Sequence, residues 1–391
     1  MALQQVARCP RPLLTARCLI QPRADVRPYA VVGSTTFIGK PPAPPDPPSV
    51  PGPGANVGGN ASPSLSSSFD AHILAELRRN AQLQGEHTLG ATRGPAARQT
   101  QLPELIEQYV DRSGLVLDAS LPYESRPAQE RRVVFDAEEE AEASVAMVVH
   151  VAENGAEHKI TYCSGFALSA PKLAEGQALY VTCAHTLEEI RFNPVVRPLL
   201  STQRSAALPG PSGSFVITGT SSRPTFSPVS SILSSLHRSD LVLLSAASSA
   251  RPPLRALPVS PYPAHPGTRI RAHFVTNKPP TSGPDAEGWR PWVGGTWSKW
   301  VRGSIVGYRD LAGREAKPGT YDALSHMLFD PPPTPGSSGG PIVDEESGAV
   351  IGIMLGTQMR NRIEGVSGWG APSELIFEMF SLPGLKLKNR T

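Results

Sequence analysis

The loop around Ser338 holds the residue of this chain best suited to act as a nucleophile. It reads PGSSGGP over residues 335–341 and leads directly into an apolar stretch. A serine attacks a carbonyl carbon only where a tight loop exposes its hydroxyl and nearby backbone N–H groups stabilise the resulting oxyanion. Ser338, beside two glycines, is the predicted nucleophile in preference to Ser337. The N–H groups of Gly336 and Ser338 form the predicted oxyanion hole, because glycine lets the backbone approach a substrate closely.

A nucleophilic serine needs a base, and His185 has the sequence context of one. It follows an apolar strand in the run YVTCAHTL over residues 180–187, where the small Ala184 leaves room beside the imidazole. Such a strand would hold the base at a constant distance from the nucleophile. Other histidines lie among polar, proline or glycine neighbours and are predicted to be surface or loop residues: His72, His87, His158, His237, His265 and His326.

The third residue of such a site is a carboxylate that orients the imidazole and stabilises its charged form. Asp240 opens the run DLVLL over residues 240–244, and no other acid between His185 and Ser338 leads directly into an apolar strand. The remaining acids are weaker candidates because of their polar surroundings or their closeness to His185 in the chain: Glu188, Glu189, Asp285, Asp310 and Asp322. The predicted catalytic residues are therefore His185, Asp240 and Ser338.

The elements that must position these residues are short strands. Beyond the acidic run at 138–140, apolar stretches alternate with turn residues, and strands are predicted at 145–151, 160–168, 179–182, 214–218, 241–244, 269–275, 342–343 and 350–355. Many short strands with few helical patterns predict an all-β fold, either a β-barrel or a sandwich, and the span of residues 133–382 can hold two six-stranded barrels. We expect two six-stranded antiparallel barrels within residues 133–382, a short helix at 373–380 near the end, and a C-terminal tail at 383–391.

The segment before the barrels divides into three parts. Residues 1–30 carry five arginines against one acid, the charge bias of a mitochondrial transit peptide, and a basic tail of a cytoplasmic protein is the alternative. Residues 31–68 are rich in proline, glycine and serine and predict a disordered linker. Residues 69–132 predict a short helical extension, with one helix capped by Asp70 and a second beginning at Pro103. This extension is predicted to pack on the main domain, and a pro-segment or regulatory arm is the alternative.

Composition excludes several other classes of protein. The formal net charge of the 391 residues is +3, and the arginines form no patch with interleaved aromatic residues, so nucleic acid is not an expected partner. No stretch approaches the roughly 20 apolar residues of a membrane span. Beyond Cys9 and Cys18, the chain has only Cys163 and Cys183, which are too few for a disulfide framework. A reducing compartment is the simpler interpretation, with a single bridge between these two as the alternative.

The order His185, Asp240, Ser338, with these local sequences, resembles the chymotrypsin-like serine peptidases. The likeness is greatest to the high-temperature-requirement (HtrA or DegP) branch and to the bacterial glutamyl endopeptidases. Three further segments are similar to that branch: SGF at 164–166, Asp330 ahead of the nucleophile loop, and GAPS at 370–373. The resemblance covers about residues 145–380. It implies a serine endopeptidase that acts through an acyl-enzyme.

Two departures from this family bear on regulation. Trypsin-type zymogens place an acid immediately before the nucleophile to bind a newly cut N-terminus, but that position here is Ser337. Activation by that route is therefore not expected. Many HtrA proteins carry a PDZ domain after the peptidase domain, and no chain follows Thr391 to form one. Regulation through such a domain is not expected either.

The positions that set specificity in these peptidases carry no charge here. Pro332 stands where tryptic relatives hold an acid, and Met354 stands where glutamyl endopeptidases hold a histidine. We therefore predict cleavage of protein or peptide substrates after a small or medium-sized apolar residue. The predicted substrate-binding residues are Pro332 and a strand to which the peptide adds, formed by Ile353, Met354, Leu355 and Gly356. The chemistry needs no metal and no organic cofactor, and the sequence leaves the oligomeric state open.

Two other functions remain compatible with this pattern. The same fold can lose turnover and persist as a binding or scaffold protein. A loop that covers Ser338 would favour that function, and the tryptophan-rich stretch between Trp289 and Trp300 is long enough to do so, although packing between barrel loops is its expected role. A self-processing protease that cuts its own linker is the other alternative.

Overall fold

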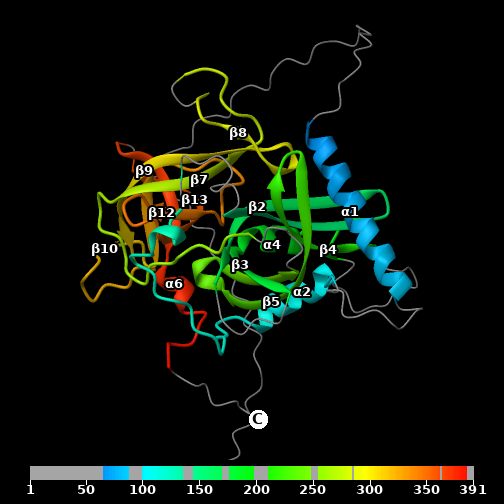
Figure 1. The fold of residues 1–391 in the computed structure, drawn as a ribbon, viewed down its shortest axis with the longest axis horizontal. Helices are drawn as coiled ribbons and strands as arrows, with labels where there is room; N and C mark the ends of the chain where they lie inside the picture. The colour runs from blue at the N-terminus through cyan, green and yellow to red at the C-terminus, as the bar shows by residue number, and fades with distance from the viewer. Residues whose placement is uncertain are drawn as a thin grey trace, which may run out of the picture. The chain divides into compact units, whose positions relative to one another are not determined.

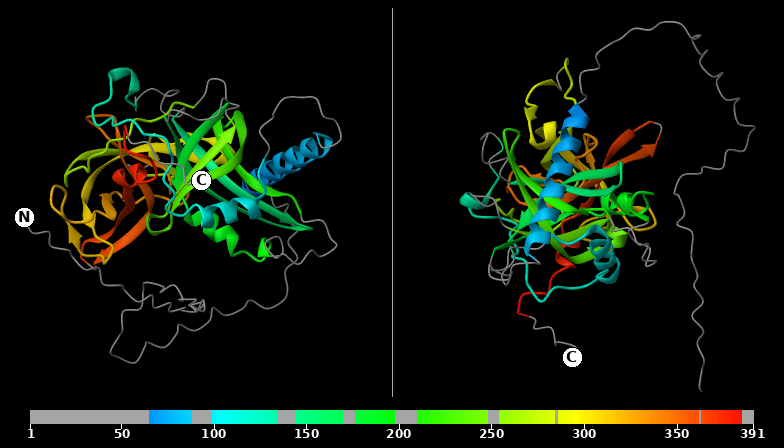
Figure 2. Two further views of the ribbon diagram at one scale, coloured as in Figure 1. Left: turned by 90° about the horizontal axis from the view of Figure 1, so that it is seen from below. Right: turned by 90° about the vertical axis from the view of Figure 1, so that its right-hand side faces the viewer.

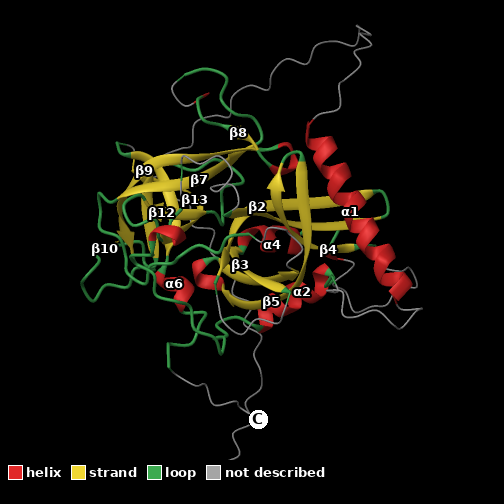
Figure 3. Cartoon of the chain, viewed as in Figure 1, coloured by secondary structure: helices red, strands yellow, loops and turns green. Residues whose placement is uncertain are grey.

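A computed structural model describes residues 65–87, 99–133, 135, 144–169, 176–197, 210–247, 254–283, 286–361 and 363–384. Strands dominate these residues, with few helices (Figure 3). The helices are α1 (Leu65–His87), α2 (Leu102–Asp111), α4 (His185–Arg191) and α6 (Glu374–Phe377), and short 3₁₀ turns lie at η1 (Gln129–Arg131), η2 (His237–Ser239) and η4 (Val293–Gly295).

The first barrel is a closed ring of six antiparallel strands in the order β1-β2-β3-β6-β5-β4 (Figure 1). These strands are β1 (Val145–Asn154), β2 (Glu157–Leu168), β3 (Gln177–Cys183), β4 (Ser212–Thr220), β5 (Arg223–Leu236) and β6 (Leu241–Ala247). The ring closes because β4 returns to pair with β1, so no strand edge of this sheet is left without a partner. Phe166, Val181 and Leu243 are fully buried in its core.

The second barrel also closes as a six-stranded ring. Its strands are β7 (Arg269–Thr276), β9 (Trp297–Arg309), β11 (His326–Asp330), β12 (Pro341–Asp344), β13 (Val350–Asn361) and β14 (Gly365–Pro372), with the short β8 (Arg290–Pro291) and β10 (Glu315–Ala316) attached to β9. The order is β9-β11-β14-β13-β12-β7, and β7 pairs again with β9 to complete the ring. The predicted fold of two six-stranded antiparallel barrels with a short C-terminal helix is confirmed.

Four barrel strands were not among those predicted: β5, β9, β11 and β14. Serine, proline, glycine and charged residues weaken the propensity of β5, β9 and β14 for extended structure, and β14 reads GVSGWGAP. Tertiary packing explains why such a sequence forms a strand. A Cβ added at Gly368 would lie 2.4 Å from the ring of Phe329 on β11, so only glycine lets the two strands approach this closely.

Both faces of β1 are buried, which explains its uninterrupted apolar run. Successive side chains of a strand point to opposite faces. Ala146 and Val148 lie in the core of the first barrel, whereas Met147 and Val149 lie in a second apolar cluster on the other face. Helix α1 covers that second face, and Figures 1 and 2 show it in blue beside the strands of the first barrel. Helix α1 is therefore part of the fold.

The two predicted helices of this segment pack on the first barrel. In α2, the spacing of Leu102, Leu105, Ile106 and Tyr109 places all four in the core of that barrel. Helix α1 begins at Leu65, before the predicted start and inside the predicted linker, so Asp70 does not cap it. Helix formation is cooperative, and the serines after Leu65 cost little per residue, so a helix anchored by packing extends through them.

Several predictions fall outside the described residues. These are the transit peptide at 1–30, most of the linker at 31–68, and all but the first two residues of the tail at 383–391. Among the helices that the structure describes, none combines the length and the hydropathy needed to cross a membrane.

Candidate active site

The predicted base and acid meet at one end of the first barrel. Strand β3 ends at Cys183 and the chain turns into α4 at His185, while Asp240 directly precedes β6, the strand that pairs with β3. The Nδ1 atom of His185 lies 2.6 Å from Oδ2 of Asp240. Pairing of these two strands thus brings together two residues that lie 55 positions apart in the chain. A carboxylate at Nδ1 leaves Nε2 as the ring atom that can accept a proton.

The backbone at Asp240 is held in an unusual conformation that aims its carboxylate. Its φ is +55° and its ψ is 39°, and no other non-glycine residue among those described has a positive φ. Left-handed backbone is costly for residues other than glycine, although aspartate tolerates it better than most. The N–H of Ala184 lies 3.0 Å from both Oδ1 and the carbonyl oxygen of Asp240, so the chain beside the base anchors this turn.

The local environment shifts the proton affinity of the base. Burial lowers the pKa of His185, but the hydrogen bond and the negative charge of Asp240 outweigh burial and raise the pKa above its ordinary value. The pair therefore stabilises the imidazolium form. That is the form a base takes when it removes a proton from a nucleophile.

The nucleophile loop contrasts two adjacent serines. Ser337 is fully buried, and its Oγ accepts a hydrogen bond of 2.8 Å from the N–H of Val275. Ser338 is half-buried, and its Oγ donates a hydrogen bond of 3.1 Å to the carbonyl oxygen of Leu355. The Ser337 hydroxyl is thus part of the packing between the loop and β7, whereas the Ser338 hydroxyl remains accessible.

Contacts between the barrels bring the Ser338 loop to β2 and to the end of β3, just before His185. The N–H of Ser164 on β2 donates to the carbonyl oxygen of Ser338 at 2.7 Å, and its hydroxyl donates to the carbonyl oxygen of Gly336 at 2.9 Å. Gly339 has a φ of +81°, and a Cβ added there would lie 2.1 Å from the oxygen of Ser164 and 2.9 Å from the nitrogen of Cys183. The loop reaches the first barrel this closely only because residue 339 is glycine.

Two backbone donors in the loop are available to a ligand. Within the described residues, the N–H groups of Gly336 and Ser338 donate no hydrogen bond to another group of the chain. Gly336 has a φ of +93°, which glycine adopts without strain. Unused donors beside an accessible hydroxyl are the elements of an oxyanion hole. In the resting arrangement the Ser338 hydroxyl bonds to Leu355, and no hydrogen bond joins it to His185.

The predicted substrate-binding residues occupy different environments. Pro332 is exposed, whereas the side chains of Ile353 and Met354 are fully buried in apolar clusters. Leu355 is buried as well, but its carbonyl oxygen reaches Ser338. The α-carbon of Gly356 has no neighbouring atom where a side chain would begin. Of the four strand residues, Leu355 offers its backbone carbonyl oxygen to a peptide, and Gly356 leaves room beside its α-carbon for one.

The thiols of Cys163 and Cys183 lie close to the base. Both are free and buried, and Sγ of Cys183 lies 3.7 Å from Nε2 of His185. Burial, together with a hydrogen bond to Cys163, raises the pKa of the Cys183 thiol well above its ordinary value. Cys183 is therefore an uncharged thiol, and the groups that raise the pKa of His185 are Asp240 first and then Cys163 and Glu189.

Sequence reasoning missed several residues that build this site. Ser164 appeared only as part of a resemblance, although it makes two hydrogen bonds to the nucleophile loop. His150 and His273 were not assigned a place, and both are buried in strands. Burial lowers the pKa of His150 to about 4 and that of His273 to about 3, so both rings are neutral at pH 7. An apolar strand context predicts a buried neutral histidine as readily as a base, which is why these two carried no distinguishing signal.

The tryptophan-rich stretch packs within the fold. Trp292 is buried in the cluster beneath α1, and Trp300 lies partly buried against the same cluster. Both rings contact the imidazole of His273 edge-on, with ring centroids 5.2 Å apart in each pair. These contacts agree with the expected role in packing between loops.

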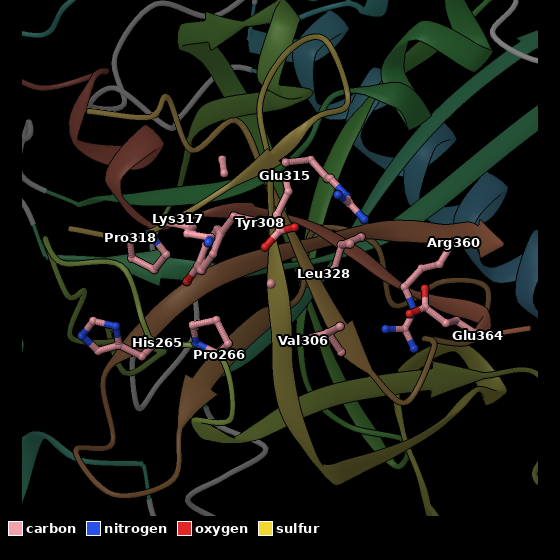
Figure 4. A pocket seen from close by; sticks show the side chains of 13 residues that line it. His265, Pro266, Val306, Tyr308, Glu315, Lys317, Pro318, Leu328, Arg360 and Glu364 are labelled. Atoms are coloured by element: carbon pink, nitrogen blue, oxygen red, sulfur yellow. The ribbon is translucent and has the colours of Figure 1, made fainter. Parts of the chain in front are cut away.

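A cavity of about 450 Å³ opens in the second barrel (Figure 4). Its walls include Tyr308, Glu315, Lys317 and Arg360, so charges of both signs face it. Arg360 lies 3.6 Å from the carboxylate of Asp330. None of the residues that line this cavity belongs to the predicted triad. Elsewhere in the described ranges, no group of three or more histidine, cysteine or acidic side chains is arranged to hold a metal ion.

Comparison with known families agrees with this geometry. The family model of the trypsin-like peptidase domain matches residues 163–353. That range contains His185, Asp240 and Ser338 together. Residues 163–353 thus match a trypsin-like peptidase domain. The domain is that of a serine-type endopeptidase, and protein or peptide substrates follow from it.

Solved structures similar to the peptidase domain include several proteases. Deg5 shares 16% identity over 61% of this chain and 87% of its own, with a TM-score of 0.37. The apo protease domain of MamO from Magnetospirillum magneticum shares 16% identity over 59% of this chain and 93% of its own, with a TM-score of 0.34. The HtrA-type protease AlgW with a decapeptide shares 18% identity over 60% and 62%, with a TM-score of 0.34. None of the curated proteins compared with the sequence matches it.

Proposed function

We propose that this serine peptidase hydrolyses peptide bonds through an acyl-enzyme, with His185, Asp240 and Ser338 as its triad. The observation that carries the proposal is the 2.6 Å contact between Nδ1 of His185 and Oδ2 of Asp240. This contact lies next to the end of β3, where the Ser338 loop approaches Cys183. The N–H groups of Gly336 and Ser338 form the oxyanion hole. Their freedom from other acceptors in the described residues supports this role.

The proposed reaction gives each residue of the triad a role. A bond forms between Oγ of Ser338 and the substrate carbonyl carbon while the hydroxyl proton moves to Nε2 of His185. The carbon–nitrogen bond then breaks, and the same proton passes to the leaving amine. Water repeats the sequence against the ester, which returns the proton to Ser338 and releases the new carboxylate. Asp240 keeps its charge throughout and stabilises the imidazolium.

Substrate binding would also release the serine from its resting partner. An extended peptide that pairs with β13 can donate an N–H to the carbonyl oxygen of Leu355, which now accepts from the Ser338 hydroxyl. The displaced hydroxyl is then free to turn toward His185. Catalytic hydrogen bonds in proteins without ligand often form only in the complex, so the resting geometry is compatible with turnover.

Labelling with a fluorophosphonate probe tests the proposed nucleophile. We expect the purified parent to be labelled, and Ser338→Ala and His185→Ala to lose the label while remaining folded by circular dichroism. A folded parent that takes no label would instead favour a protein that keeps the protease fold for binding. Labelling that persists in Ser338→Ala would assign the nucleophile to another residue.

The raised pKa of His185 predicts the acidic limb of the pH profile. Catalysis needs the neutral imidazole as base, so kcat/KM should fall as the pH drops through a value above the ordinary histidine pKa near 6.5. Asp240 comes before Cys163 and Glu189 among the groups that raise this pKa, so Asp240→Asn should move this limb to lower pH. Hydrolysis of a peptide substrate from pH 5 to 9 measures both profiles. An acidic limb that stays in place in the variant would contradict the assignment of Asp240.

We further propose a preference for a small or medium-sized apolar residue before the cleaved bond. The uncharged Pro332 and the buried, apolar Met354 support it, because neither offers a charge to a basic or acidic substrate side chain. Cleavage of a peptide library, with products read by mass spectrometry, should give mainly alanine, valine or leucine at that position. Products dominated by arginine, lysine or glutamate would overturn this preference.

A further inference from the structure

Helix α1 contacts both barrels through Phe69. The ring of Phe69 meets the ring of Tyr162 on β2 edge-on, with centroids 5.8 Å apart and planes at 75°. It also lies against Gly294 of η4, where an added Cβ would sit 2.3 Å from a carbon of the Phe69 ring. A residue outside the barrels is thus wedged between a strand of the first barrel and a loop of the second.

Tyr162 in turn contacts the nucleophile loop. A Cβ placed on Gly336 would lie 3.0 Å from Cε2 of Tyr162, so the tyrosine ring packs directly against this glycine. The hydroxyl of Tyr162 donates to Oδ1 of Asn277, 2.6 Å away, just beyond the end of β7. The ring is therefore held at two places, by Phe69 along its side and by Asn277 at its tip.

The other wall of the loop is formed by Val275 on β7. Its Cγ1 lies 3.5 Å from the position of a Cβ on Gly336. Its N–H donates to Oγ of Ser337 at 2.8 Å, and its carbonyl oxygen accepts from Oγ1 of Thr334 at 2.6 Å. Val275 belongs to the apolar cluster that α1 covers, as Ile73 and Leu77 do. Both walls around Gly336 therefore depend on the same packed cluster.

Polar contacts fix the helix on the barrel. Arg78 pairs with Glu153 on β1 through two hydrogen bonds, one of them 3.1 Å long. Near Phe69, Asp70 faces His158 on β2 at 3.7 Å. The helix is thus held on the first barrel along its length, and Figure 1 shows it in blue beside β2 and β4.

From these contacts we propose that α1 supports the oxyanion hole, with Phe69 and Tyr162 as positioning residues for the N–H of Gly336. A glycine has no side chain to restrict its own backbone, so neighbouring groups must determine the direction of its N–H. The Tyr162 ring, held by Phe69, occupies the space into which Gly336 would otherwise relax. This inference rests on the proposed role of the Gly336 N–H in catalysis.

Burial of α1 against the barrel would not by itself give this helix a role in catalysis, whereas support of the oxyanion hole does. Loss of the Phe69 ring would leave the triad contact between His185 and Asp240 intact, because that contact lies within the first barrel. Stabilisation of the oxyanion would weaken, since its donor would lose alignment. The rate of the chemical step should therefore fall, whereas binding of the uncharged substrate should change little.

The kinetics of Phe69→Ala in the full chain test whether Phe69 positions the N–H of Gly336. Removal of one oxyanion donor costs about 10²–10³ in kcat, so misalignment should lower kcat about tenfold or more with KM nearly unchanged. A peptide boronic acid, which presents a tetrahedral oxyanion, should bind more weakly by a similar factor. Tyr162→Ala should behave in the same way, and Tyr162→Phe, which keeps the ring, should lose less activity.

Leu74→Ala is the matched control. Leu74 lies in the same helix as Phe69 and packs against the same cluster, but the ring contact with Tyr162 belongs to Phe69. It should lower the Tm as Phe69→Ala does while keeping kcat within about twofold of the parent. Equal losses of kcat in Phe69→Ala and Leu74→Ala, or an unchanged boronate affinity in Phe69→Ala, would overturn the proposal. A parent without hydrolytic activity or fluorophosphonate labelling would instead contradict the proposed function itself.

Discussion

Replacement of Ser338 by alanine should lower kcat for peptide hydrolysis about 10⁶-fold, the loss known when the nucleophile of a serine protease triad is removed. The half-buried hydroxyl bonds only to the carbonyl oxygen of Leu355, so its removal leaves the loop, the base and the acid in place. The Tm should therefore change little. Steady-state hydrolysis by equal concentrations of parent and variant, both shown to be folded by circular dichroism, measures the loss without confusion from unfolded protein.

Ser337→Ala is the control for this variant, because it changes the adjacent hydroxyl. That hydroxyl is buried and accepts the N–H of Val275, so its loss leaves a buried donor without a partner. We expect a loss of about 1–3 kcal/mol in stability and a decrease in kcat far smaller than that of Ser338→Ala. Activity in Ser338→Ala within a hundredfold of the parent would refute the assigned nucleophile.

Replacement of Asp240 by asparagine should lower kcat about 10⁴-fold, the effect seen for the same change in a serine protease triad. The amide can turn its NH₂ toward Nδ1 of His185, which then becomes an acceptor and places the proton on Nε2. A protonated Nε2 cannot remove the proton of Ser338. Asparagine also tolerates the left-handed backbone at residue 240, so the turn should survive.

A surface carboxylate provides the comparison for Asp240→Asn. Asp310 pairs with Arg314 four residues away on an exposed turn, and Asp310→Asn should leave kcat unchanged. If both variants retained the parent's kcat, the 2.6 Å contact would have no catalytic role.

Local sequence predicted the chemistry more completely than it predicted the strands. The loop at 335–341, the histidine after an apolar strand and the acid before one were found because each has a short signature. Strands β5 and β14 were missed because their serines, prolines and glycines carry little intrinsic strand preference. Pairing with β6 and β13 makes them strands, and such pairing has no local signature.

For the helical extension, too, local sequence did not predict where α1 begins or which distant residues it contacts. Apolar spacing predicted that α1 and α2 would pack on the main domain, and both do. The start of α1 at Leu65 was not predicted, since the residues before Asp70 have the composition of a linker. The contact of Phe69 with Tyr162 was also not predictable, because those residues lie 93 positions apart in the chain (162 less 69).

The sequence by itself determined the class of chemistry, because a nucleophile loop, a base and an acid each depend on neighbours a few residues away. It also predicted an all-β fold from its many short apolar strands, in a span of residues long enough for two six-stranded barrels. Only the tertiary structure decided which groups complete the site: the Ser164 bonds to the loop, the resting bond from Ser338 to Leu355, and the wall that Tyr162 forms beside Gly336. These contacts join segments from different barrels, and a chain encodes such proximity only through packing of the whole domain.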